Sequence, residues 1–161
     1  MTMKLSTAVV CFLLSIGLTL SCSKPKPMPT TMRSVYYWST TLNMDSVKTA
    51  FMRNYDISRM YIRYFDVVAD QSGRAVPNAT LKFATDVPQG IDIVPTVFVM
   101  PECLRQDRSR LASLIVKRVV QMNETNDVYN VKEIQIDCDW TQSTRQLYAE
   151  FMQAMMRECH S

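Results

Sequence analysis

The sequence predicts an α/β fold built from parallel βα repeats, and three observations support this prediction. Segments with strand composition alternate with segments of helical periodicity between residues 34 and 160. One segment, 91–99, is almost wholly apolar and β-branched, as is typical of a strand covered on both faces. Another, 133–140, alternates polar and apolar side chains, which gives a strand with one polar face. This order of elements favours a parallel sheet with helical cover.

The N-terminal residues are expected to form a targeting segment and a tether. Residues 5–20 are an uncharged apolar run, which is short for a membrane span and typical of a signal-peptide core. Three prolines within 23–31, without apolar periodicity, indicate an extended tether. We therefore expect a signal peptide at 1–21, a tether at 22–33 and one folded domain at 34–161.

Two strands and a helix are expected in the first half of this domain. The aromatic segment 34–39 has strand composition. Asp45 opens a helical pattern that runs toward Tyr55. The apolar stripe of this helix consists of Val47, Phe51 and Met52. A second strand is expected at 59–67, followed by a loop and a short extra strand within 79–84.

The second half of the domain is expected to contain two further strand–helix pairs. Segment 91–99 is the third strand, although Pro95 removes one ladder donor from it. A helix at 108–123, a fourth strand at 131–140 and a last helix capped by Ser143 or Thr144 follow. The apolar stripes of the two helices are Leu111, Leu114, Ile115, Val119 and Met122, and Leu147, Phe151, Met152 and Met155.

The alternation assigns side chains to the two faces of the sheet. Apolar side chains should face the helices, and these are Met60, Ile62, Tyr64, Ile134, Ile136 and Cys138. The opposite, inward face should carry Tyr61, Arg63, Phe65, Glu133, Gln135, Asp137 and Asp139. An arginine among inward carboxylates favours the polar interior of a partial TIM barrel, comprising about half of its (β/α)8 units, over an open doubly wound sheet.

Composition and spacing argue against several classes of function. The net charge of +3 is spread along the chain without a basic stripe, so we expect no nucleic-acid partner. No glycine-rich turn follows a strand, which disfavours a dinucleotide cofactor, and we expect no cofactor and no metal. His160 has no cluster around it, which leaves a Ser-His-Asp or zinc mechanism unsupported. The pairing of Cys103, Cys138 and Cys159 is left open, with three free thiols favoured over one disulfide.

The candidate site residues lie at the expected carboxyl ends of the strands, where barrel enzymes place their catalytic groups. Asp137 and Asp139 are the candidate catalytic residues. The candidate substrate-binding residues are Trp38, Arg63, Asp66, Glu102 and Trp140. The alternative is that Asp137 and Asp139 pair with Arg63 and neutralise a polar interior. Tyr36 and Tyr37 are expected to serve packing more than ligand contact.

The end of the signal-peptide core resembles the lipobox of bacterial lipoproteins. Thr19-Leu20-Ser21-Cys22 places small residues before a cysteine, although Thr19 stands where that motif usually has leucine. The resemblance implies cleavage before Cys22 and a lipid on its thiol. The expected location is therefore the bacterial cell envelope, with the protein lipid-anchored to an inner or outer membrane. An ordinary secretory signal is the alternative.

The segment 134–140 is similar to the fourth barrel strand of the chitinase-like family 18 glycoside hydrolases. That strand ends in a D-x-x-D-x-D-x-E motif whose final glutamate is the general acid. Asp137 and Asp139 match the second and third acidic positions, whereas Ile134 and Thr141 occupy the first and last. The general acid is therefore replaced, and the resemblance does not carry the mechanism over to this chain.

A broader resemblance covers most of the domain. The blocks 36–42, 60–67, 93–98 and 134–141 resemble the first half of an uncharacterised group of barrel-shaped envelope lipoproteins in the glycoside hydrolase-like superfamily. A complete barrel needs eight βα units and about 250 residues, and about four units are expected here. The chain is therefore expected to be a truncated fragment, or else a half-barrel that needs a partner half or a homodimer.

Two functions follow from these resemblances. The chain is either a surface-anchored glycoside hydrolase-like domain that acts on an external glycan, or a non-catalytic lipoprotein that binds glycan or a protein. Thr141 at the position of the general acid favours the second, and whether the chain is an enzyme stays open at this stage.

Overall fold

The structure is a computed structural model, and it describes residues 32–160. The expected signal peptide, Cys22 and nearly all of the tether lie outside the described residues. The described part is a mixed α/β fold with a mostly parallel sheet, as the alternation of elements predicts. Its elements are β1 (Arg33–Tyr37), β2 (Thr41–Leu42), α2 (Ser46–Asn54), β3 (Ile57–Ala69), β4 (Ala75–Asn78), β5 (Lys82–Phe83), β6 (Asp92–Val99), the 3-10 helix η1 (Pro101–Arg105), α3 (Arg108–Thr125), β7 (Gln135–Asp137) and α4 (Arg145–Cys159).

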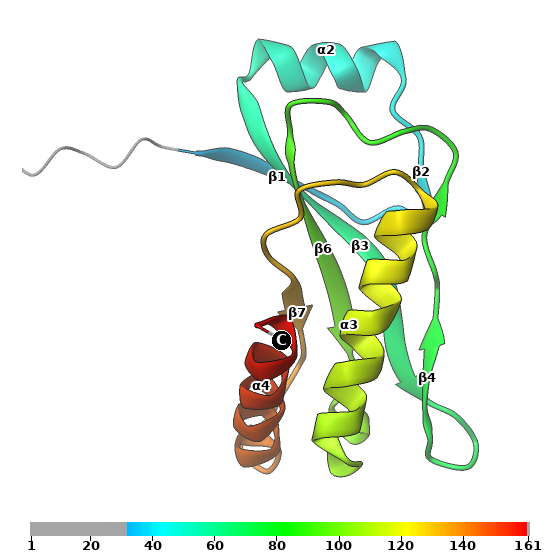
Figure 1. The fold of residues 1–161 in the computed structure, drawn as a ribbon, viewed down its shortest axis with the longest axis vertical. Helices are drawn as coiled ribbons and strands as arrows, with labels where there is room; N and C mark the ends of the chain where they lie inside the picture. The colour runs from blue at the N-terminus through cyan, green and yellow to red at the C-terminus, as the bar shows by residue number, and fades with distance from the viewer. Residues whose placement is uncertain (1–31, 161) are drawn as a thin grey trace, which may run out of the picture. The chain divides into compact units, whose positions relative to one another are not determined.

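The main sheet has the order β1-β3-β6-β7, with all four strands parallel. β4 pairs antiparallel with the end of β3, and β2 and β5 form a separate small parallel sheet. Figure 1 shows α3 and α4 side by side in front of the main sheet, whereas α2 lies across its end. The four strands of the main sheet therefore lie side by side in the order in which they occur along the chain.

The hydrophobic core lies between the main sheet and the pair α3 and α4. Tyr64 is fully buried there, and its hydroxyl donates a hydrogen bond of 2.8 Å to Oδ1 of Asn123 on α3. Burial of the phenol raises the pKa of Tyr64 well above its usual range. The other large members of the core that are almost fully buried include Met60, Ile62, Phe65, Val97, Val99, Leu104, Ile115, Val119 and Phe151.

A bulge in β3 changes which residues face the helices. The register between β3 and β6 shifts between Arg63 and Phe65, so that Tyr64 is the extra residue. Met60, Ile62 and Tyr64 belong to the core as predicted, but Phe65 is 1% exposed and also belongs to it. The inward assignment of Phe65 was therefore wrong, because strict alternation fails at a bulge.

The fourth strand is much shorter than the segment 131–140 predicts. Only Gln135–Asp137 pairs with β6, in the register of Thr96 to Phe98. Pairing begins at Thr96, directly after Pro95, which has no N–H group to donate. Ile134, Ile136 and Cys138 nevertheless pack against the core, as their alternation predicts.

The helices begin close to their predicted first residues, and Asp107 is a cap that was not predicted. The carboxylate of Asp45 accepts the N–H of Lys48 at 2.8 Å, and Asp107 accepts those of Ser109 and Arg110. Thr144 is the N-cap of α4, but its Oγ1 accepts from the N–H of Thr141 at 2.8 Å instead. The predicted stripe of α2 is only partly correct, since Met52 is buried while the two other residues, Val47 and Phe51, are exposed.

A tight turn joins β3 to β4. Asp70 accepts hydrogen bonds from the Ser72 hydroxyl and the N–H groups of Ser72 and Arg74, and these bonds lower the pKa of Asp70 to about 2. Gly73 adopts φ +77° in this turn, a conformation that strains other residues. Gln106, two residues before α3, donates to the carbonyl oxygen of Gly73 at 2.6 Å and accepts from the N–H of Ala75 at 3.1 Å, which ties this turn to the start of α3. Among residues 32–160, no helix has the length and apolar character of a membrane span.

Candidate functional site

The face of the main sheet opposite α3 and α4, here called the open face, carries most of the candidate residues. Its side chains follow from the strand register, in which Tyr36, Tyr61 and Val94 form one row and Arg63, Thr96 and Gln135 form the next. Val94 is buried but lies outside the main core cluster, which fits its place on this second face. The predicted inward orientation of Tyr61, Arg63 and Gln135 is therefore consistent with the register.

Aromatic rings form a row at the β1 side of the open face. The ring of Tyr36 stacks on Tyr61, with centroids 4.7 Å apart and 20° between the planes. Trp38 stacks on Tyr36, at 5.9 Å and 10°. Trp38 lies at the end of the row and is 47% exposed, so that part of its ring surface is open to a ligand. Tyr36 therefore stacks on both neighbours, and its expected role in packing more than in ligand contact stays a prediction.

A hydrogen bond connects this row to the far side of the sheet. The hydroxyl of Tyr36 on β1 donates to Oε1 of Gln135 on β7 at 3.1 Å. Two strands, β3 and β6, lie between the strands that carry these residues. Side chains from the first and last strands of the main sheet, β1 and β7, therefore meet over the open face.

Arg63 pairs with Asp66 rather than with Asp137 or Asp139. Nε of Arg63 donates to Oδ1 of Asp66 at 2.8 Å, and Nη2 donates to Oδ2. The side chains are 25% and 11% exposed. Residues three apart in a regular strand lie on opposite faces, and the bulge at Tyr64 brings this pair onto one face. Accepting both donors leaves Asp66 a poor candidate for proton transfer.

A second cation, Arg59, lies on the open face near the start of β3, in register with Asp92 of β6. It contacts Glu133 at 2.9 Å and Asp92 at 3.7 Å. Arg59 therefore neutralises the charge of Glu133, and neither Asp137 nor Asp139 takes part in these ion pairs. Thr96 lies between Arg63 and Gln135 and is 1% exposed, yet its hydroxyl has no hydrogen-bond partner among residues 32–160.

The candidate catalytic carboxylates lie at the end of β7. Asp137 is the last residue of β7 and is in register with Phe98, which is in turn in register with Asp66. Asp139 and Glu102 lie in the segments after β7 and β6. The side chains of all three candidates, Asp137, Asp139 and Glu102, form no hydrogen bond or ion pair within the described range.

The thiol of Cys138 lies among these charges. Burial, followed by the nearby charges of Asp139 and Asp137, raises the pKa of Cys138 to about 11. Cys138 is therefore protonated at neutral pH and is a poor nucleophile. Cys103, Cys138 and Cys159 are all free thiols in the described part of the chain. No group of acidic, histidine or cysteine side chains suited to a metal ion occurs between residues 32 and 160.

Trp140 does not join the aromatic row. Its ring stacks on Tyr148 of α4, with centroids 6.0 Å apart and 16° between the planes. The structure therefore brings Trp38, Arg63, Asp66 and Asp137 to the open face and sends Trp140 toward α4. Tyr36 and Tyr61 join Trp38 in the aromatic row, although neither was among the candidate substrate-binding residues. Their positions two residues before Trp38 and Arg63 are the signal that could have found them.

The fold and this face together define an α/β protein with a mostly parallel sheet and an open face of aromatic and charged side chains. The chain matches no protein-family model, and comparisons with curated proteins and with solved structures find no significant match.

Proposed function

We propose that this chain is a lipid-anchored protein of the bacterial cell envelope that binds glycan through the open face without turning it over. The domain would be part of a TIM-barrel-like fold of the glycoside hydrolase-like superfamily. The four parallel strands lie in the sheet in the same order as along the chain, as successive strands of a (β/α)8 barrel do, and this supports such a partial barrel. The Tyr36–Gln135 hydrogen bond supports it too, because a sheet that curves toward this face brings distant strands together.

The observation that carries the proposal is the aromatic row of Trp38, Tyr36 and Tyr61. Sugar rings present flat C–H surfaces that stack on exposed aromatic faces, and Trp38 offers such a face at the end of the row. The Arg63–Asp66 pair and Gln135 supply donors and acceptors for hydroxyl groups nearby. An apolar platform with a few fixed polar groups is the usual composition of a small-ligand site.

Two features favour binding over hydrolysis. Glycoside hydrolysis usually needs a protonated carboxyl group and a second carboxylate. Both carboxylate oxygens of Asp66 accept hydrogen bonds from the Arg63 guanidinium, so neither oxygen is free to approach a leaving group. Thr141, at the position of the general acid in the similar family, carries a hydroxyl that lies 2.9 Å from the Ser143 hydroxyl. Neither position therefore offers a proton donor of the required kind.

Hydrolysis is the second candidate, because one observation favours it. Asp66 and Asp137 flank Phe98 in one row of the sheet, so their Cα atoms are separated by two strand spacings, roughly 10 Å. That spacing allows the two carboxyl groups to reach the separation of about 6.5–9.5 Å that inverting glycosidases use.

A pair of tryptophan variants tests the binding proposal. Trp38→Ala should weaken glycan binding roughly tenfold or more, because it removes the open ring surface. Trp140→Ala is the matched control, since Trp140 has nearly the same exposure, 46% against 47%, but stacks on α4. The measurement is binding of the full chain to an array of envelope and host glycans, followed by titration of the best ligand. Equal losses in both variants would contradict the proposed site.

The same glycans distinguish binding from hydrolysis. We expect no release of reducing sugar from any bound glycan, and unchanged binding by Asp139→Asn. Turnover that Asp137→Asn abolishes would replace the binding proposal with the hydrolase. If no glycan binds at all, the glycan proposal fails in both forms.

The lipid anchor is tested through Cys22. In a bacterial host, Cys22→Ser should abolish incorporation of labelled palmitate and move the protein from the membrane fraction to the soluble fraction. Cys11→Ser is the control, because Cys11 lies within the expected signal peptide and would be removed with it. Continued labelling of Cys22→Ser would exclude the lipobox interpretation.

A further inference from the structure

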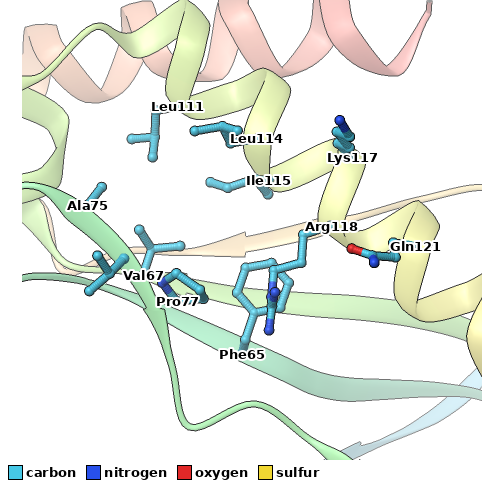
Figure 2. A pocket seen from close by; sticks show the side chains of 11 residues that line it. Phe65, Val67, Ala75, Pro77, Leu111, Leu114, Ile115, Lys117, Arg118 and Gln121 are labelled. Atoms are coloured by element: carbon cyan, nitrogen blue, oxygen red, sulfur yellow. The ribbon is translucent and has the colours of Figure 1, made fainter.

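A pocket on the helix side of the sheet has no role in the proposed function. It lies between α3 on one side and β3 and β4 on the other, and its volume is about 280 Å³ (Figure 2). The chain passes from β3 to β6 through a hairpin and loops without an α-helix. Among the described residues, the helical part of the lining comes from α3 alone. Its apolar lining includes Phe65, Val67, Leu111, Leu114 and Ile115.

The pocket contains a cation, Arg118, that has no acidic partner within residues 32–160. The guanidinium of Arg118 lies 5.2 Å from the ring centroid of Phe65, and its Nη2 donates to Oγ1 of Thr80 at 2.9 Å. Nε of Arg118 is buried and has no hydrogen-bond partner within residues 32–160. Lys117 is the second cation of the lining, and none of the lining residues is acidic. Burying a donor without an acceptor is costly. Two cations and no acidic side chain in the lining favour an anionic ligand in the adjoining pocket.

We propose that this pocket binds a free medium-chain alkanoate, with its hydrocarbon chain in the apolar lining and its carboxylate on Arg118. A carboxylate suits Arg118 because a guanidinium donates to its two oxygens in a fixed, planar geometry. The small volume suits a single unbranched chain better than a larger amphiphile. The proposal is independent of glycan binding, because the pocket lies on the side of the sheet opposite the open face.

Three ligands of equal chain length test the charge requirement. We expect sodium octanoate to bind to the full chain, made by cell-free synthesis without detergent, as measured by isothermal titration calorimetry. 1-Octanol should bind at least roughly tenfold more weakly, because it lacks the charge-assisted hydrogen bonds. Octylammonium should bind no better than 1-octanol. Equal binding of octanoate and 1-octanol would overturn the proposal.

Variants locate the ligand in the pocket. Arg118→Gln should weaken octanoate binding roughly tenfold and leave 1-octanol binding unchanged. Arg157→Gln is the matched control, because Arg157 is exposed on α4 outside the pocket, and it should change neither affinity. Leu114→Asp places a carboxylate at the mouth of the pocket, where Leu114 is 54% exposed, so the fold should tolerate it while octanoate binding falls.

Two results would contradict the inference outright. Octanoate binding that survives both Arg118→Gln and Leu114→Asp would place the ligand elsewhere, including on the apolar N-terminal run. If octanoate does not bind and Leu114→Asp converts a dimer to a monomer in light scattering, the groove is a contact with a second copy of the chain.

Discussion

Replacing Phe151 with alanine is expected to lower the free energy of unfolding by about 3–5 kcal/mol, the usual cost of removing a fully buried aromatic side chain. Phe151 is 0% exposed and belongs to the core between α4 and the sheet. β7 has three residues and, within the described part of the chain, pairs only with β6. The packing of α4 therefore contributes much of the stability of this edge of the sheet. A loss of this size is a large fraction of the total stability of a small domain.

Urea unfolding measures this effect, and hydrogen exchange locates it. Met156→Ala is the control, because Met156 lies on the same helix and is 61% exposed, and it should change stability by no more than about 0.5 kcal/mol. In Phe151→Ala the amides of β7 and α4 should exchange faster than those of β3. A similar cost for the two variants would mean that α4 does not dock on the sheet as described.

Replacing Asp66 with alanine is expected to cost about 2–3 kcal/mol, because it leaves the Arg63 guanidinium largely buried without its carboxylate. Both side chains are mostly withdrawn from solvent, at 25% and 11% exposure, so water replaces the lost hydrogen bonds only in part. The hydrogen bond to Asp66 raises the pKa of Arg63 in the unmodified chain. Arginine remains protonated at neutral pH without it, so the variant keeps an unpaired charge on Arg63.

Asp137→Ala is the matched control for Asp66→Ala. Asp137 lies in the same row of the sheet, but its side chain has no hydrogen bond or ion pair in the part of the chain that the structure describes. Its removal should change the free energy of unfolding by less than about 0.5 kcal/mol. In a double-mutant cycle with Arg63→Met, Asp66→Ala should show a coupling energy well above that of Asp137→Ala. If Asp137→Ala is the more costly change, Arg63 pairs with Asp137, as the sequence interpretation allowed.

Local patterns were sufficient to predict the kind and order of most elements. The alternation in 133–140 correctly placed Ile134, Ile136 and Cys138 toward the core, because a strand has a period of two even where its ladder is short. The helical stripe of 108–123 correctly identified Leu111, Ile115, Val119 and Met122 as buried, but its fifth member, Leu114, is 54% exposed. Asp45 was correctly placed at the start of α2, since capping depends on residues within one turn.

Residues far apart in the chain decided what these patterns could not. The pairing of Ile57–Ala69 with β6 includes a bulge at Tyr64, and no local signal marks the position of that extra residue. The bulge turns Phe65 toward α3 and brings Asp66 beside Arg63, which changes the partner that the sequence proposed for this arginine. Likewise, only the finished sheet brings Tyr36 of β1 to Gln135 of β7.

Local sequence patterns were enough to predict an α/β chain with alternating elements and a polar strand face. The N-terminal lipoprotein signal stays a prediction. Contacts between distant parts of the chain set which polar residues of that face pair and which aromatic rings stack. They also leave an apolar pocket beside α3 whose lining includes two cations. The reason is physical: periodicity and capping depend on neighbours within a few residues, whereas register, bulges and pockets depend on how separate strands and helices meet.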